Sequence, residues 1–149
     1  MGVKIICKNK RAGYDFFLME KFEAGLVLQG TEIKVLREGK GNINDAYVHI
    51  DPQGEAWIYN MQIPHYKFGN IANHEEFRKR KLLLNKSEIA QIVKNIQLQR
   101  LTVVPTSLYF KDSRVKIEIA LAKGKKMYDK RDSEAKKDVE RKLRRQEYE

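Results

Sequence analysis

The stretch VKIEIALAKGKKMYDKR, residues 115–131, holds both the pattern that decides the fold and the point at which that pattern ends. Its first half alternates between apolar and polar residues, which predicts a β-strand with one face toward a core. The inward face would carry Val115, Ile117, Ile119 and Leu121. The second half places five cations around one glycine and one tyrosine, a composition suited to a phosphate backbone and a stacking base. We therefore expect a core-forming domain to end here and a charged segment to follow.

The bulk composition limits both the architecture and the partners. A chain of 149 residues has room for one ordinary domain and an appendage. With 30 Lys and Arg against 20 Asp and Glu, the net charge is +10, which favours nucleic acid as the partner over an acidic membrane surface. No apolar run approaches the ~20 residues of a membrane span, and residues 1–10 lack a signal-peptide core. A soluble, cytoplasmic protein is expected.

The sequence offers little for catalysis or metal binding. The single cysteine, Cys7, excludes an internal disulfide and a multi-cysteine zinc site, and we expect it to be a small buried apolar residue. The three histidines lack metal-ligand spacing, and no Walker-type phosphate loop is present. Glu23 and Glu32 are separated and have no partner that would mark an acid–base pair. We expect neither an enzyme, nor a cofactor, nor a metal.

The first half of the chain predicts two strands, a helix and a hairpin. Aromatic and apolar enrichment over residues 14–19 predicts the first strand, and residues 26–28 form either a strand or a buried turn. A helix capped by Thr31 is expected to run until Gly39. The pattern of Tyr47–Ile50 and Ala56–Tyr59 predicts a hairpin around a type I turn.

The second half predicts a loop, a helix and three more strands. Residues 64–81 have no clear period and are expected to form a long, partly ordered loop. Capping residues 85–88 precede an apolar helical face, which comprises Ile89, Ile92, Val93 and Ile96. Residues 101–104 and 108–110 predict two strands, interrupted by Pro105, ahead of the alternating strand.

This set of elements predicts a mainly β fold. Five or six short strands with two helices, not regularly alternating, fit a small antiparallel barrel of the oligonucleotide-binding (OB) type, with a two-sheet sandwich as the alternative. We expect the barrel to span residues 1–122 and a basic tail to span 123–149. The only apolar stripe of the tail is Ala135, Val139 and Leu143, too thin to offset the entropy of ordering. The tail is therefore expected to be disordered alone and helical against a partner.

Four elements are candidates for RNA binding. Three are basic segments: Asn9-Lys10-Arg11, Arg78-Lys79-Arg80-Lys81 and Lys123-Gly124-Lys125-Lys126. Their cations would contact phosphates without reading sequence. The fourth is Tyr128, an aromatic residue in a charged segment, which would either stack on an exposed base or fold back onto the barrel.

Seven runs of the chain, in order, resemble one protein family. They are Asn9-Lys10-Arg11-Ala12, Phe22-Glu23-Ala24-Gly25, Gly30-Thr31-Glu32-Ile33-Lys34 with Leu36-Arg37, Tyr59-Asn60-Met61, Arg80-Lys81-Leu82-Leu83-Leu84, Leu108-Tyr109-Phe110, and Ala122-Lys123-Gly124-Lys125-Lys126 with Asp129-Lys130-Arg131. Together they are similar to the small protein B family, the bacterial SsrA-binding proteins, over essentially the whole chain.

The resemblance implies an OB-type barrel, a tail unstructured in solution, and a function in trans-translation. Family members bind the tRNA-like part of transfer-messenger RNA, whose alanyl-charged form travels with elongation factor Tu, and bring it to stalled ribosomes. Peptide tagging and ribosome rescue follow. The barrel would replace the missing anticodon arm, and the tail would enter the empty messenger channel of the small subunit as a helix.

The resemblance also implies particular contacts. It places RNA contacts on Glu23, Leu83 and Asn85, with Asn9, Lys10 and Arg11 as a weaker extension. With the basic positions, the expected RNA-binding set is Asn9, Lys10, Arg11, Glu23, Arg80, Lys81, Leu83, Asn85, Lys123, Lys125 and Lys126. In the tail, Asp129, Lys130 and Arg131 match the motif required on the ribosome, and Tyr128 takes the aromatic position that stacks in the decoding centre.

The chain departs from the family pattern at Val35, Glu76 and Arg100, where a small polar residue, proline and glycine are usual. We expect an effect on helix packing from the first and on loop stiffness from the others. Composition alone also fits a general RNA- or ribosome-associated barrel whose tail is a plain electrostatic anchor. An RNA-processing enzyme would need a histidine or carboxylate cluster that the sequence lacks.

Overall fold

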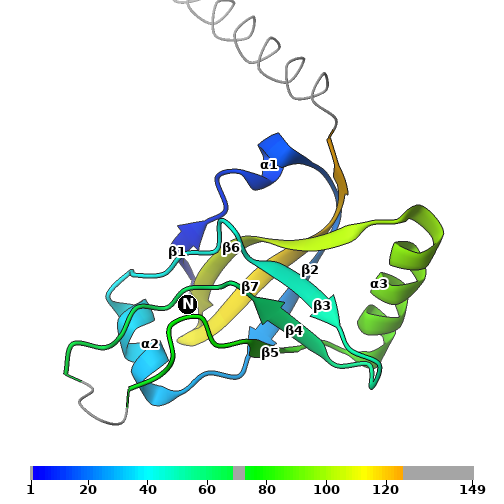
Figure 1. The fold of residues 1–149 in the computed structure, drawn as a ribbon. Coiled ribbons are helices and arrows are strands. Elements are labelled where there is room, and N and C mark those ends of the chain that lie inside the picture. Colours follow the sequence, from blue (N-terminus) through cyan, green and yellow to red (C-terminus); the bar gives the residue numbers. More distant parts are fainter. Residues whose placement is uncertain (1, 69–72, 126–149) are drawn as a thin grey trace, which may run out of the picture.

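Hydrogen bonding between strands closes six antiparallel strands into a barrel. The computed structural model describes residues 2–68 and 73–125. The order around the barrel is β6, β3, β4, β5, β2, β7, and β7 pairs back onto β6 (Figure 1). These strands are β2 (Phe16–Leu26), β3 (Tyr47–Ile50), β4 (Ala56–Tyr59), β5 (Arg80–Leu83), β6 (Thr102–Lys111) and β7 (Arg114–Gly124). The closure confirms the OB-type barrel and excludes the sandwich.

The hairpin of β6 and β7 is the longest paired unit and carries the predicted alternation. Its two-residue turn holds Asp112 and Ser113 at φ 51° and 69°, the left-handed geometry of a type I′ turn, which matches the twist of the strands. Ile117 and Ile119 are fully buried inside the barrel. Contrary to the alternation, Ala120 and Ala122 on the other face are buried too, and Ala122 belongs to a second small cluster. That cluster contains Ala12 and Val104, with Phe16 and Leu18 packed against it.

The predicted strand over residues 14–19 is confirmed for residues 16–19, but it is not the first strand, and residues 14 and 15 are helical. The first strand is β1 (Val3–Lys8), which pairs with the end of β6. A single helical turn, α1 (Ala12–Asp15), follows, because the backbone N–H groups of Tyr14 and Asp15 both donate to the carbonyl of Arg11. β2 then begins at Phe16 and continues to Leu26, so the open choice at residues 26–28 resolves as a strand end followed by a loop.

Pro105 does not interrupt its strand. β6 is continuous across it, and the register toward β7 shifts between Pro105 and Ser107, which is a β-bulge. A bulge tolerates proline because it leaves one residue outside the regular hydrogen-bond ladder. One edge of β6 is shared: its second half pairs with β1, and Val103 alone pairs with Val48 of β3. That single residue pair joins the β3–β4 hairpin to β6.

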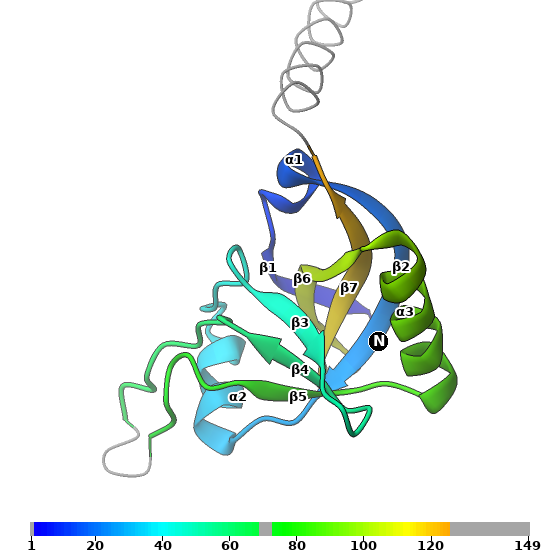
Figure 2. The ribbon, with the colours of Figure 1, turned by 45° about the vertical axis from the view of Figure 1, so that its right-hand side comes forward.

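Both longer helices form where the sequence predicts them. α3 (Lys86–Gln99) begins with a capping box of Asn85 and Glu88, and buries Ile92 completely. It ends at Arg100, which takes the left-handed conformation (φ 51°) that glycine would adopt more easily. α2 (Gly30–Arg37) is capped by Gln29 instead of Thr31. Figures 1 and 2 show α2 at the end of the barrel away from α1, with α3 along one side.

A buried ion cluster joins α2 to β5. Glu32 and Arg80 are both 0% exposed, and the Arg80 Nε–H donates to the Glu32 carboxylate. Arg78 approaches the same carboxylate at 2.5 Å, and the backbone N–H of Gln29 donates to it at 2.8 Å. Burial alone would raise the pKa of Glu32, but these donors hold that pKa below its ordinary value.

The Arg80 guanidinium is saturated by this environment. Besides Glu32, it donates to the carbonyl oxygens of Met61, Arg78, Glu75 and Glu76. Burial lowers the pKa of Arg80, and the neighbouring carboxylate partly restores it. The expectation of four cations free to bind phosphate at residues 78–81 is therefore wrong for Arg80, whose role in this structure is internal.

Replacing Arg80 tests the cluster. We expect Arg80→Leu to lower the free energy of unfolding by about 3–5 kcal/mol, because the Glu32 carboxylate stays buried without its main partner. Urea denaturation at neutral pH measures the change.

Lys81→Leu is the matched control, since the half-exposed Lys81 amine pairs with the exposed Glu55, and its loss should change stability by less than about 1 kcal/mol. Equal losses in the two variants would contradict the cluster's role. Because the pKa of Glu32 is lowered, its contribution is present at neutral pH and is lost as the pH falls below about 4.3.

Candidate nucleic-acid interface

One exposed surface gathers residues from four strands around Glu23, and we call it the Glu23 face. It comprises Glu23 on β2, Leu83 on β5, Tyr109 and Lys111 on β6, and Lys116 on β7. The register places Gly25 opposite both Leu83 and Lys116, so the three strands carry these residues in one row. The alternation of each strand then points Glu23 and Leu83 outward on the same side of the barrel.

The Glu23 carboxylate is fixed in place and kept ionised. The Tyr109 hydroxyl donates to it at 2.6 Å, and the Lys111 amine lies at 3.4 Å. The hydrogen bond from Tyr109 lowers the pKa of Glu23, and Lys111 and Lys116 lower it further. Burial and the same carboxylate raise the pKa of Tyr109. At neutral pH this arrangement presents an oriented acceptor, suited to base or ribose donors of RNA more than to phosphates.

Leu83 lies on the strand next to that of Glu23, and Asn85 follows it in the loop before α3. Leu83 is 54% exposed although it is apolar, and its side chain lies against Gly25, where a Cβ would come within 3.4 Å. Asn85 is the N-cap of α3. Together with Lys81 and Lys86, they line an open hollow of about 460 Å³. Of the three contacts implied by the family resemblance, Leu83 is therefore next to the strand of Glu23 and shares a hollow with Asn85.

A second surface, which we call the basic end, lies at the opposite end of β2 and β7. It comprises Lys10, Arg11, Lys123 and Lys125. The backbone N–H of Lys125 donates to Asp15, its amine donates to the Gly13 carbonyl, and both distances are 2.9 Å. Lys123 pairs with Phe17 across the strands. Segments more than a hundred residues apart in sequence thus form one basic surface.

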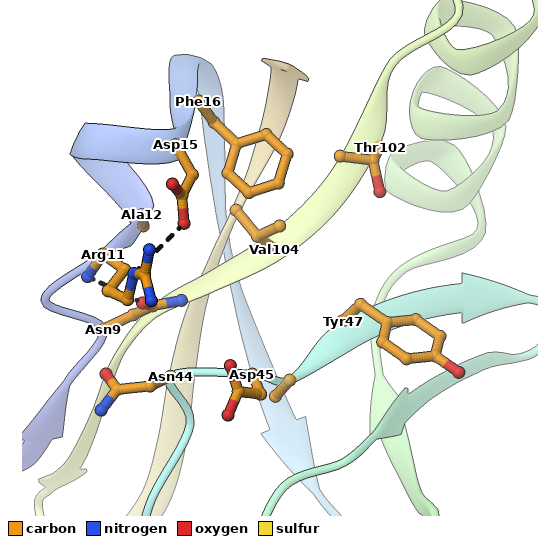
Figure 3. A pocket seen from close by; sticks show the side chains of 11 residues that line it. Asn9, Arg11, Ala12, Asp15, Phe16, Asn44, Asp45, Tyr47, Thr102 and Val104 are labelled. Carbon is orange, nitrogen blue, oxygen red and sulfur yellow. Dashed lines mark hydrogen bonds and ion pairs between the residues drawn. The ribbon is translucent and has the colours of Figure 1, made fainter. Parts of the chain in front are cut away.

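A small cavity opens beside the basic end. It has a volume of about 230 Å³ and lies between α1, the start of β3 and β6. Figure 3 shows the Arg11 guanidinium beside Asp15, at 3.5 Å, and the Tyr47 ring pointing away from both. Asn44 accepts a hydrogen bond from the Lys10 backbone at 3.2 Å, which ties the basic loop to this segment.

The other candidate residues have different surroundings. Asn9 is half-buried and fixed by hydrogen bonds, since its amide donates to the Pro105 carbonyl and its oxygen accepts from the Arg11 backbone N–H. Lys81 is half-exposed and pairs with Glu55 at 3.2 Å. Lys126, Tyr128, Asp129, Lys130 and Arg131 lie outside the described residues.

Sequence reasoning missed Tyr109, Lys111 and Lys116 as partners of Glu23. They are 86 or more residues away from Glu23 along the chain and meet it only through the strand register. The one available signal was the Leu108-Tyr109-Phe110 run, which we used only to predict a strand and for the family resemblance. Over residues 2–68 and 73–125, no group of three potential metal ligands occurs, and no helix is long and apolar enough to cross a membrane.

A closed antiparallel barrel with one surface built on an oriented carboxylate and another on clustered cations defines an OB-type nucleic-acid-binding protein. The family model described as SmpB protein matches residues 6–149. The chain belongs to the SmpB family.

Curated relatives and a solved structure agree with this assignment. The SsrA-binding proteins of Geotalea uraniireducens and Pelobacter propionicus are 54% and 52% identical, over 95% and 96% of this chain and 93% of each relative. The solved structure "tmRNA-SmpB: a journey to the center of the bacterial ribosome" is 38% identical with a TM-score of 0.67. That match covers 81% of this chain and 85% of the other.

The hydrogen bond between Tyr109 and Glu23 gives a direct test of the Glu23 face. We expect Tyr109→Phe to raise the pKa of Glu23 toward its ordinary value, because the hydroxyl is the largest cause of the lowered pKa. A pH titration of the Glu23 carboxyl carbon by NMR measures this.

Tyr47→Phe is the control, since Tyr47 contacts Tyr59 and not Glu23. An unchanged titration of Glu23 in Tyr109→Phe would show that the hydroxyl does not hold the carboxylate in solution.

Proposed function

We propose that this chain binds transfer-messenger RNA (SsrA RNA) and delivers it to stalled ribosomes in trans-translation. The observation that carries the proposal is membership in the SmpB family, with relatives named SsrA-binding proteins that are half identical over almost the whole chain. A structure of the tmRNA–SmpB complex on the bacterial ribosome is among the similar folds. The protein acts as an RNA-binding adapter in the cytoplasm and performs no catalysis itself.

The Glu23 face supports a specific contact with the tRNA-like domain. An ionised carboxylate repels phosphates, so its place on an RNA-binding surface requires a hydrogen-bond donor on the RNA. Leu83 beside it offers an apolar contact for a base or ribose, and Asn85 an amide at the edge of the hollow. Lys111 and Lys116 flank the carboxylate and supply contacts to neighbouring phosphates.

The basic end supports a second partner. Lys10, Arg11, Lys123 and Lys125 lie where the chain leaves the barrel, and Lys126 follows directly. We assign them to phosphate contacts. Beyond them, Tyr128, Asp129, Lys130 and Arg131 are assigned to the decoding centre and messenger channel of the small subunit, and the alanyl-charged RNA complex with elongation factor Tu is the form delivered.

Removing the Glu23 carboxylate distinguishes specific contact from charge attraction. We expect Glu23→Ala to weaken SsrA RNA binding about ten-fold or more, because a hydrogen bond to a charged group is lost. Binding isotherms with purified RNA measure the change at fixed salt.

Glu38→Ala removes the same charge from a carboxylate of similar exposure, 42% against 39% for Glu23, on the C-cap of α2. It should leave binding unchanged or slightly tighter. Tighter binding by Glu23→Ala as well would favour a general electrostatic RNA-binding barrel.

Removing residues 127–149 separates the two proposed partners. We expect SsrA RNA binding to stay within about three-fold of the full chain, since less than 1 kcal/mol of contact is removed. Peptide tagging on stalled ribosomes should be abolished in a reconstituted translation assay. Joint loss of RNA binding and tagging would indicate that the tail is an electrostatic anchor for the RNA.

A further inference from the structure

The outer surface of the β3–β4 hairpin carries three aromatic side chains that no part of the proposed function uses. Val48 and Ile58 point into the core, so their neighbours on each strand point outward. We call the outward set Tyr47, Trp57 and Tyr59 the aromatic band. Figure 2 shows β3, β4 and β5 side by side.

The rings of the band are ordered with respect to one another. Tyr47 and Tyr59 are cross-strand partners, stacked with centroids 5.4 Å apart and planes 12° from parallel. Tyr47 is nevertheless 44% exposed, so much of this ring faces solvent. His49 meets the Tyr59 ring edge-on at 6.4 Å. A parallel pair with an exposed ring extends naturally by one more planar group.

Trp57 continues the band toward β5 and carries its own polar anchors. Its indole N–H donates to Asp51 at 2.9 Å, and the Lys79 amine lies 4.6 Å above its ring. Lys81 is its cross-strand partner on β5. The two lysines supply cations beside the rings, in positions suited to the phosphates of a stacked strand.

The band is continuous with the Glu23 face. On β5, Lys81 and Leu83 point to the same side because they are two residues apart, and Leu83 lies against Gly25 of β2. Outward residues therefore run without a break from β2 across β5 and β4 to β3. RNA seated on the Glu23 face would have this band beside it.

We infer that the aromatic band is a second RNA-binding site, which stacks unpaired bases on Tyr47 and against Trp57. Asp51 is close enough to Lys79 for the two charges to interact, and Glu55 pairs with Lys81, so stacking, more than phosphate attraction, supplies the affinity. An apolar protein partner fits the face less well, because tyrosine hydroxyls, histidine and lysine are interspersed with the rings. The inference rests on RNA as the partner in the proposed function and adds a surface to it.

The single tryptophan of the chain makes the site directly observable. Titration with a single-stranded RNA of about ten nucleotides should quench Trp57 emission, since a stacked base contacts its ring. Tyr47→Thr should weaken that binding about ten-fold, whereas Tyr47→Phe should bind as the wild type does, because stacking needs the ring and not the hydroxyl. Threonine favours strands, and thermal melting checks that the barrel persists.

Phe68→Ala is the matched control. Phe68 is 68% exposed and has the Lys67 amine 5.9 Å above its ring, but it lies in the loop after β4 and outside the band. It should bind the oligonucleotide as the wild type does. Equal affinity for wild type and Tyr47→Thr, or an equal loss in Phe68→Ala, would overturn the inference. A lowered melting temperature without a change in affinity would also overturn it, since that indicates only a cross-strand packing role.

Two further measurements identify the source of the bases. Weaker binding of Tyr47→Thr to isolated SsrA RNA places the unpaired bases in that RNA. Weaker binding to small ribosomal subunits, with SsrA RNA binding intact, places them in ribosomal RNA. If Tyr47→Thr weakens binding neither to SsrA RNA nor to small ribosomal subunits, the proposed role of the band is overturned. Failure of the proposed function is distinguishable, because it would appear as unchanged SsrA RNA binding in Glu23→Ala.

Discussion

The buried ion pair of Glu32 and Arg80 is the constraint on which the rest of the structure depends. It joins α2, which precedes the β3–β4 hairpin, to β5, which follows it, and it also binds four backbone carbonyls of the intervening chain. Both charges are fully enclosed, so removing either one leaves the other buried without its main opposite charge. The position of β5, and with it Lys81 and Leu83, follows from this pair. A buried interaction therefore determines where these surface residues of β5 lie.

The strand register determines which side chains lie next to one another on the barrel surface. Gly25 has no side chain, so Leu83 can lie across β2 and remain exposed beside Glu23. Tyr109 reaches Glu23 over β7 because the three strands are in fixed register. At the far end of the same strands, Lys125 is tied to Gly13 and Asp15. One barrel wall thus separates an oriented acceptor at one end from a cluster of cations at the other.

Local patterns in the sequence predicted the hairpin, both long helices and the alternating last strand, because periodicity and capping act within a few residues. They did not predict α1, the unbroken β6 or the burial of Arg80, each of which depends on a partner far along the chain. Asn9 shows the same limit, since its amide is used by the bulge at Pro105. For the candidate site, the family resemblance supplied Glu23, Leu83 and Asn85. The residues that orient the Glu23 carboxylate could be identified only from the strand register, which the sequence does not show. At Arg100 the backbone takes the left-handed conformation that ends α3. Glycine adopts this conformation most easily, which explains why the family usually has glycine there.

The single residue pair between Val48 and Val103 gives the barrel an uneven distribution of local stability. Every other join between barrel strands contains two or more residue pairs within the described chain, so opening at the junction of β3 and β6 disrupts the fewest hydrogen bonds. Local opening there would separate β3 from β6, while β4 stays paired with β5 and the β2–β7–β6 wall stays intact. The hairpin would then remain joined to the barrel through β5, whose position is fixed by the buried pair.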